Sequence, residues 1–210
     1  MQLKPNEVLT VPCRLAFASL FRATAVHPTT PDKLAYQATI LIPAGTDLTP
    51  FKRAIVAAME AEWGKTIPLT GNGMPLKSNK GRAYAGFDDD GYHLKVKTKF
   101  APQVVDQSKT PIMSAGPLAS ADELARAIPA AEARVYAGCW CHFYIATFAW
   151  DNAAGKGVSF NLNAVQLVRD GDRLDGRKDA DDIFGTIDGA KPTPAAHPVE
   201  ADDPLAGLMS

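Results

Sequence analysis

The sequence predicts a mainly β domain with one or two helices and a disordered acidic C-terminal tail. Sixteen Gly and sixteen Pro are scattered among short apolar runs, which favours many strands and turns over a helical bundle. Residues 1–178 hold 21 Lys and Arg against 16 Asp and Glu, whereas residues 179–210 hold one Lys against seven acids. We therefore expect a basic domain over 1–178 and a flexible acidic tail over 179–210.

Two strands precede the first helix. Residues 8–21 form the first strand, in which Leu15 and Phe17 share a half-buried face and Pro12 marks an edge or a bulge. After a turn at 27–32, residues 36–42 alternate in the same way and form the second strand.

A helix is predicted from residue 49 to residue 63. Thr49 is the expected N-cap, Pro50 suits the first helical position, and Gly64 ends the helix. Apolar residues fall four apart between these ends, at Phe51, Ile55, Met59 and Trp63. We expect this stripe to pack on the core, with a binding groove as the alternative.

The rest of the domain is read from its turns and caps. A basic loop over 68–80 precedes a strand at 92–100, and the capping box formed by Ser120 and Glu123 predicts a short second helix. Residues 135–150 and 158–168 predict a hairpin with its turn at 151–155.

The strand 92–100 is the first candidate binding surface. Because strand side chains alternate, Leu94, Val96 and Phe100 are expected in the core. The outer face then carries a row formed by His93, Lys95, Lys97 and Lys99. Ammonium groups about 6–7 Å apart repel one another unless solvent or an anion screens them, and a phosphate backbone fits that spacing. A solvated strand face is the alternative.

Alternation over 136–144 predicts a second row of side chains. One face carries Cys139, Cys141 and Phe143, and the other carries Tyr136, Trp140, His142 and Tyr144. If the cysteines face the interior, the aromatic rings form an exposed ladder that can stack unpaired bases, each stack contributing about 1–3 kcal/mol. Burial in the core or in a subunit interface is the alternative.

No catalytic residue, cofactor or metal site is predicted. Residues 139–142 have metal-binding types, but the strand period directs His142 away from both thiols. Asp88, Asp89 and Asp90 before Gly91 predict a solvated turn, with a metal-dependent nuclease as the enzymatic alternative. Phosphate-loop, nucleophile-elbow and zinc-protease motifs are absent from the sequence. No apolar run approaches the about 20 residues of a membrane span, and we expect a cytoplasmic protein.

Five segments together resemble the phage and prophage single-stranded-DNA-binding proteins, and are similar to the short-tailed coliphage helix-destabilising protein. They are RLAFASLF at 14–21, the strand at 36–43, KTKFAPQVVD at 97–106, YAGC at 136–139 and NLNAVQLVRDG at 161–171. The resemblance, from about residue 11 to residue 184, implies an oligonucleotide/oligosaccharide-binding (OB) fold, a five-stranded Greek-key barrel. It also implies roles in DNA replication, recombination and repair in the cytoplasm of a bacterial host.

The resemblance assigns a role to the tail as well. Relatives of this kind use an acidic tail to contact replication or recombination proteins and to compete with DNA for the basic groove. The matching tip here consists of Asp181, Asp182, Ile183 and Phe184. It is followed by residues 185–210, which hold a second small acidic and apolar patch at 202–205.

These observations give one hypothesis, sequence-independent binding of single-stranded DNA. Lys95, Lys97 and Lys99 would neutralise phosphates while Trp140 and Tyr144 stack bases. The further residues predicted to contact DNA are Lys77, Lys80, Arg82, Tyr84, His142 and Arg14. An assembly protein that uses the aromatic face as a subunit interface is the non-enzymatic alternative, and the sequence leaves open whether the chain forms a homodimer.

Overall fold

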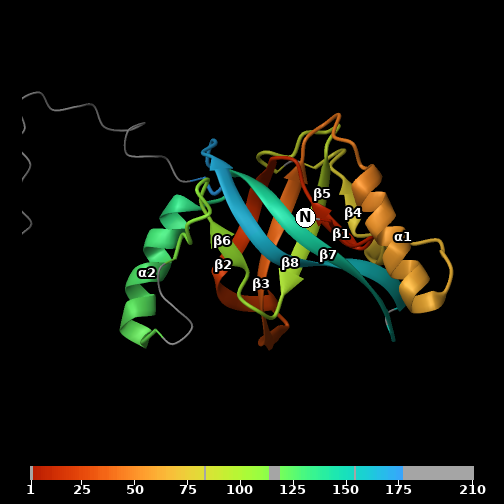
Figure 1. Cartoon of the computed structure of the whole chain (residues 1–210), viewed down its shortest axis with the longest axis horizontal. Helices are drawn as coiled ribbons and strands as arrows, with labels where there is room; N and C mark the ends of the chain where they lie inside the picture. Colours follow the sequence, from red (N-terminus) through yellow and green to blue (C-terminus); the bar gives the residue numbers. More distant parts are fainter. Residues whose placement is uncertain (1, 83, 114–118, 154, 177–210) are drawn as a thin grey trace, which may run out of the picture. The chain divides into compact units, whose positions relative to one another are not determined.

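The computed structural model describes residues 2–82, 84–113, 119–153 and 155–176 (Figure 1). The predicted tail lies outside these ranges. The elements are β1 Glu7–Leu9, β2 Cys13–His27, β3 Thr30–Ile42, α1 Thr49–Trp63, η1 Gly71–Gly73, β4 Leu76–Ser78, β5 Tyr92–Thr98, β6 Gln103–Val105, α2 Ala121–Arg134, β7 Trp140–Asn152 and β8 Gly155–Arg169.

Five strands close into a barrel, in the order β2, β3, β5, β8 and β7, with β7 pairing again with β2. If only these five barrel strands are numbered in chain order, they follow one another around the barrel as first, second, third, fifth and fourth. The third and fifth strands run parallel, with Val96 of β5 opposite Phe160 of β8. The fold is therefore an OB-type barrel, as the resemblance implied. β1, β4 and β6 lengthen the sheet at β7, β5 and β8.

Alternate side chains of the strands fill the barrel. Ala38, Ile40 and Ile42 of β3 are buried as predicted, and so are Leu94 and Val96 of β5. Each large apolar side chain removed from water contributes about 1.5–3 kcal/mol. The strands nevertheless differ from the predicted bounds: β3 already starts at residue 30, which shortens the preceding turn, and β5 ends at residue 98.

Helix α1 packs on the barrel through the predicted stripe. Phe51, Ile55 and Met59 are buried, and the ring of Phe51 meets Phe160 edge-on with 6.4 Å between centroids. Gly64 ends the helix in the left-handed region, with φ of 67°.

The start of α1 differs from the prediction. Leu48, rather than Thr49, is the N-cap residue, and it supplies no side-chain hydrogen bond. The carboxylate of Asp47 instead accepts a hydrogen bond from the backbone N–H of Thr49 at 2.8 Å. Asp47, the residue before the N-cap, therefore satisfies one of the backbone N–H groups that have no partner within the helix.

Helix α2 and the last hairpin agree with the sequence. Ser120 and Glu123 form the expected capping box, although the helix continues through Pro129 to Arg134. β7 and β8 pair antiparallel over their whole length. Figure 1 shows α2 and α1 on opposite sides of the barrel. Among the described residues, no helix is both long and apolar enough to cross a bilayer.

Candidate nucleic-acid interface

A groove of about 590 Å³ lies over the outer face of β3 and β5. Its floor includes Gln37 and Thr39 of β3 and Lys95 and Lys97 of β5. The loop over residues 79–91 forms one wall, and residues of β2, β8 and the segment from η1 to β4 complete the lining. The second and third strands of an OB barrel form the face that takes oligonucleotides in this fold. We call this feature the basic groove.

The charge of the basic groove is positive. Its cations are Lys77, Arg82, Lys95 and Lys97, and no carboxylate is among the described residues that line it. His93 lies beneath them, only 2% exposed. Burial, followed by the positive charges of Arg82, Lys77 and Lys95, lowers the pKa of His93 to about 4. The imidazole is therefore neutral at physiological pH, and the four outer cations create a site for an anion.

Aromatic rings stand at one end of the basic groove. The centroid of Phe17 lies 6.0 Å from that of Tyr84 and 6.4 Å from that of Phe87, and Tyr84 and Phe87 are 5.7 Å apart. Phe87 in turn lies 5.4 Å from the ring of His93. Phe17 and Tyr84 are 64% and 58% exposed, so their faces are open to a flat ligand. We call Phe17, Tyr84 and Phe87 the aromatic cluster.

The exposure of Phe17 comes from an irregularity in β2. The prediction that Phe17 shares the buried face of Leu15 is wrong, because Leu15 and Ala16 are both buried and Phe17 points outward. Pairing with β3 shifts register between Ala16 and Ser19, and Phe17 has a φ of 46°. A bulge re-aims a side chain in this way, and positive φ is unusual for a bulky residue.

The loop that carries Tyr84 and Phe87 is fastened to the barrel at three points. At its base, Nδ1–H of the neutral His93 donates to Oδ1 of the buried Asn79 at 2.8 Å. The backbone N–H of Asn79 also donates to the carbonyl of Gly91 at 3.0 Å. Near its tip, the methyl groups of Leu174 lie so close to Gly86 that a Cβ there would come within 2.7 Å of them. The aromatic cluster is therefore preformed.

The predicted cation row is only partly confirmed. Lys95 and Lys97 point outward into the basic groove, whereas Lys99 lies past the end of β5 and does not line it. His93 was expected outside but is buried, because the loop above covers it. Phe100 was expected in the core but is 82% exposed, because the strand has already ended.

The loop residues divide in the same way. Lys77 and Arg82 line the basic groove, and so does Tyr84, whereas Lys80 is exposed without lining it. Contact of these four residues with DNA stays a prediction. The acidic turn at 88–90 is exposed, and Asp89 accepts a hydrogen bond from the backbone N–H of Gly81 at 3.2 Å. The acids are therefore part of the loop's own turn.

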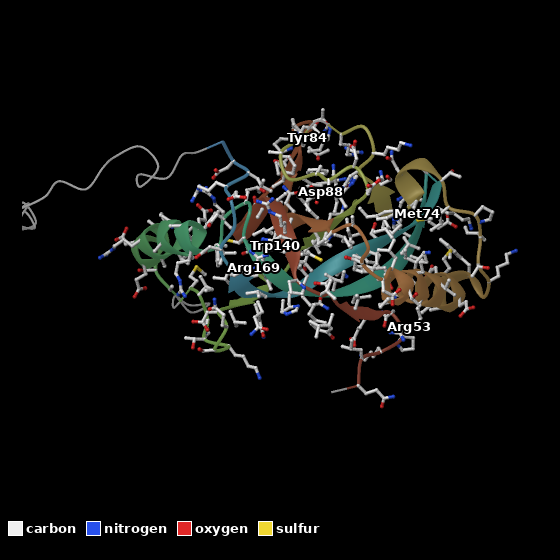
Figure 2. The ribbon with its side chains drawn as sticks, turned by 90° about the horizontal axis from the view of Figure 1, so that it is seen from above. Arg53, Met74, Tyr84, Asp88, Trp140 and Arg169 are labelled. Atoms are coloured by element: carbon white, nitrogen blue, oxygen red, sulfur yellow. The ribbon has the colours of Figure 1, made fainter. Side chains whose placement is uncertain are left out.

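The predicted aromatic row does lie on the outer face of β7. Trp140, His142 and Tyr144 are partly exposed, whereas Cys141 and Phe143 are fully buried. In the closed barrel, however, β8 separates β7 from β5 on one side, and β2 and β3 separate them on the other. The prediction that both rows line one cleft is therefore wrong. Trp140 lies beside Arg169, away from Tyr84 (Figure 2).

Trp140 is engaged within the chain. The guanidinium carbon of Arg169 lies 4.4 Å from its ring centroid, and that of Arg14 lies 5.9 Å from it. Arg14 also donates a hydrogen bond to the carbonyl of Asp172 at 2.7 Å. Arg14 thus stabilises the segment that follows β8, and its binding to DNA stays a prediction.

His142 and Tyr144 contact the N-terminal strand. Nδ1 of His142 is 2.7 Å from the carbonyl oxygen of Thr10. Hydrogen bonding to Glu7 of β1 raises the pKa of Tyr144. These two side chains hold residues 7–10 against β7, and their role in DNA binding also stays a prediction.

Comparison with known proteins decides the family. Residues 6–193 match the family described as Enterobacter phage Enc34, ssDNA-binding protein. The chain belongs to this family. A protein named p50, of Acyrthosiphon pisum secondary endosymbiont phage 1, is 31% identical over 186 residues, which cover 84% of this chain and 88% of that protein.

Solved structures share the fold of this Enc34-family chain. The single-stranded DNA-binding protein from bacteriophage Enc34, in complex with ssDNA, superposes with a TM-score of 0.63 at 16% identity, covering 81% of this chain and 90% of that one. The single-stranded DNA binding protein encoded by bacteriophage T7 has a TM-score of 0.50 at 15% identity, covering 82% and 97%. Both likenesses show the common barrel.

The three thiols of this Enc34-family chain, Cys13, Cys139 and Cys141, are all free and fully buried. Burial raises the pKa of Cys13 to about 12 and also raises the pKa of Cys139 and Cys141. Within the described residues, no group of three His, Cys, Asp or Glu side chains could hold a metal ion. The predicted tail tip at 181–184 falls outside those residues.

Proposed function

We propose that this protein binds single-stranded DNA in the basic groove without reading its sequence. The observation that carries the proposal is the position of the aromatic cluster beside four cations on the face formed by β3 and β5. Lysine and arginine neutralise phosphates whatever the base, and aromatic rings stack on any base because every base has a π face. The family name and the relative described in complex with ssDNA support the same ligand.

The division of labour follows from the geometry. Lys95 and Lys97 on the groove floor, with Lys77 and Arg82 on its walls, hold the sugar-phosphate backbone. Phe17 and Tyr84 present exposed rings at the end of that track, where a base can stack. A duplex satisfies the cations but cannot offer its bases to the rings, because they are stacked inside the helix.

A binding assay with an unstructured oligonucleotide and its duplex tests the proposal. Fluorescence anisotropy at fixed salt should show tighter binding of the single strand. Phe17→Ala should lower affinity for the single strand and leave weak duplex binding unchanged, because only the single strand uses the ring. Equal affinity of the wild-type protein for both forms would contradict the proposal.

In the cell, we propose that this binding keeps unpaired DNA open during phage replication, recombination and repair. Hairpin melting follows from preference for the single strand, since any ligand of the open form shifts the equilibrium towards it. A hairpin oligonucleotide labelled at both ends should open as protein is added. A hairpin that stays closed at saturating protein would limit the function to protection of DNA that is already open.

The tail is proposed to compete with DNA and to contact replication or recombination proteins through Asp181, Asp182, Ile183 and Phe184. The support is charge alone: seven acids follow residue 178, and the groove is cationic. Truncation after Arg177 should tighten DNA binding at low salt, and Asp181→Asn with Asp182→Asn should do so in part. Unchanged affinity of both variants would show that the tail does not occupy the groove.

A further inference from the structure

A second cavity, of about 440 Å³, lies on the other side of the aromatic cluster. Phe17 and Tyr84 line both this cavity and the basic groove. The remaining walls come from β2, which carries Arg22, from the end of α2, from the residues before β7 and from the segment after β8. They include Tyr136 and Leu174. A strand that leaves the basic groove over the two shared rings therefore enters this second cavity.

The charges of the second cavity are paired, unlike those of the basic groove. Nε of Arg22 lies 3.2 Å from Oε1 of Glu132, and Nη2 of Arg173 lies 3.0 Å from Oδ2 of Asp175. Among the described residues of its lining, two cations and two carboxylates cancel in formal charge, so these residues do not attract phosphate as the basic groove does. They do offer hydrogen-bond donors and acceptors side by side, which is what the edge of a nucleobase requires.

The walls suit a flat ligand. Phe17, Tyr84 and Tyr136 all line the cavity, and the guanidinium carbon of Arg173 lies 4.4 Å from the ring centroid of Tyr136. The hydroxyl of Tyr136 donates to the carbonyl of Gly171 at 3.0 Å, which fixes that ring. The Arg22 and Glu132 side chains are 62% and 38% exposed, so a ligand can reach both.

We propose that the second cavity receives one nucleobase of the strand bound in the basic groove, and that Arg22 and Glu132 favour guanine there. A carboxylate accepts two parallel hydrogen bonds from N1–H and the 2-amino group of guanine, while a guanidinium donates to its O6. Thymine has no amino group and presents a carbonyl on each side of N3–H, so it loses one of these bonds and meets the carboxylate with like charge. This inference rests on the proposed function and adds a base preference at one position, in the second cavity, while the basic groove itself reads no sequence.

The test compares three short oligonucleotides that differ at one nucleotide. The first is all thymidine, the second has one central guanosine, and the third has inosine at that position and so lacks only the 2-amino group. Wild-type protein should bind the guanosine strand about fivefold more tightly than the thymidine strand, which is the lower end expected for a bidentate base contact. Inosine should give an intermediate affinity.

Two variants assign the preference to this cavity. The Glu132→Gln variant should bind all three strands equally. Its affinity for the all-thymidine strand should equal that of a control variant that loses the same charge elsewhere. That control, Glu62→Gln, removes one exposed acid from α1, on the opposite side of the barrel, and should keep the preference. Arg22→Gln should also lose the guanosine preference, which guards against a folding defect peculiar to one variant.

The outcomes separate the two proposals. Wild-type protein that binds thymidine strands but does not distinguish guanosine overturns the base subsite and leaves single-strand binding intact. A guanosine preference that survives in Glu132→Gln also overturns it. Failure to bind any single strand would overturn the proposed function itself.

Discussion

The ring of Phe17 meets the ring of Tyr84 edge-on, with 6.0 Å between centroids and 88° between the two planes. Phe17 belongs to a barrel strand, whereas Tyr84 belongs to a loop that is tied down at Asn79 and Gly86. The contact therefore joins the loop to the barrel wall, and both residues stay more than half exposed. The two residues divide the surface into the basic groove and the second cavity.

Removing either ring should weaken DNA binding without unfolding the protein. We expect Phe17→Ala and Tyr84→Ala each to cost about 1–3 kcal/mol of binding free energy, measured by anisotropy at fixed salt. The double variant should lose less than the sum, because the two rings contact each other. Phe148→Ala, which removes a partly exposed ring from β7, is the matched control. A loss in the control as large as in Phe17→Ala would point to a general defect.

Salt dependence should report the four groove cations. At about 0.7 per phosphate contact, the slope of log affinity against log salt should be about −3. The double variant Lys95→Ala, Lys97→Ala should reduce its magnitude by about 1.4, because two contacts are lost. Lys52→Ala removes an exposed lysine from α1 and should leave the slope unchanged. A wild-type affinity independent of salt would rule out phosphate neutralisation.

Trp140→Ala should affect stability more than binding. The variant lacks the two contacts between guanidinium groups and the indole, and it lacks the packing of the indole against Gly171. Its free energy of unfolding should therefore fall by about 1–2 kcal/mol. Urea denaturation measures that change. Affinity for single-stranded DNA should stay at the wild-type value, because Trp140 does not line the basic groove. A tenfold loss of affinity in a folded variant would restore the aromatic row of β7 as a DNA site.

Stability should fall as the solution is acidified through the titration of His93. The pKa of His93 is lowered from 6.5 to about 4 in the folded protein. Between pH 6.5 and pH 4, the imidazole therefore binds a proton in the unfolded chain but stays neutral in the folded chain. The stability contributed by the neutral ring is present above pH 6.5 and is lost towards pH 4, by up to about 3 kcal/mol. Urea titrations of wild type and His93→Gln should diverge over that range. His27→Gln, which changes an exposed ring, should follow the wild type.

Much of the barrel could be read from local patterns. Period-two alternation assigned the inward residues of β3 and, in β5, Leu94 and Val96. It divided β7 into its two faces without deciding which one is inward, and the positions of Pro50 and Gly64 bounded α1. These signals are local, since each depends on neighbours within one element.

The arrangement of the site could not be read in that way. Whether Lys97 and Trp140 share a face depends on the order in which strands close the ring, and β8 separates them. The outward turn of Phe17 depends on a register shift against β3, which no alternation within β2 reveals. Burial of His93 depends on a loop folding back over it from outside the strand. The separation of Lys97 from Trp140, the exposure of Phe17 and the burial of His93 all depend on contacts between segments that are distant in the sequence.

The three sealed thiols give the protein a chemical property that can be used at the bench. Cys13, Cys139 and Cys141 are all the cysteines in the sequence, and their raised pKa values leave them as unreactive thiols in neutral buffer. A cysteine introduced at the exposed Ala85 would therefore be alkylated selectively by a maleimide dye. A fluorophore attached there would sit beside Tyr84 and could follow the arrival of each DNA strand in real time.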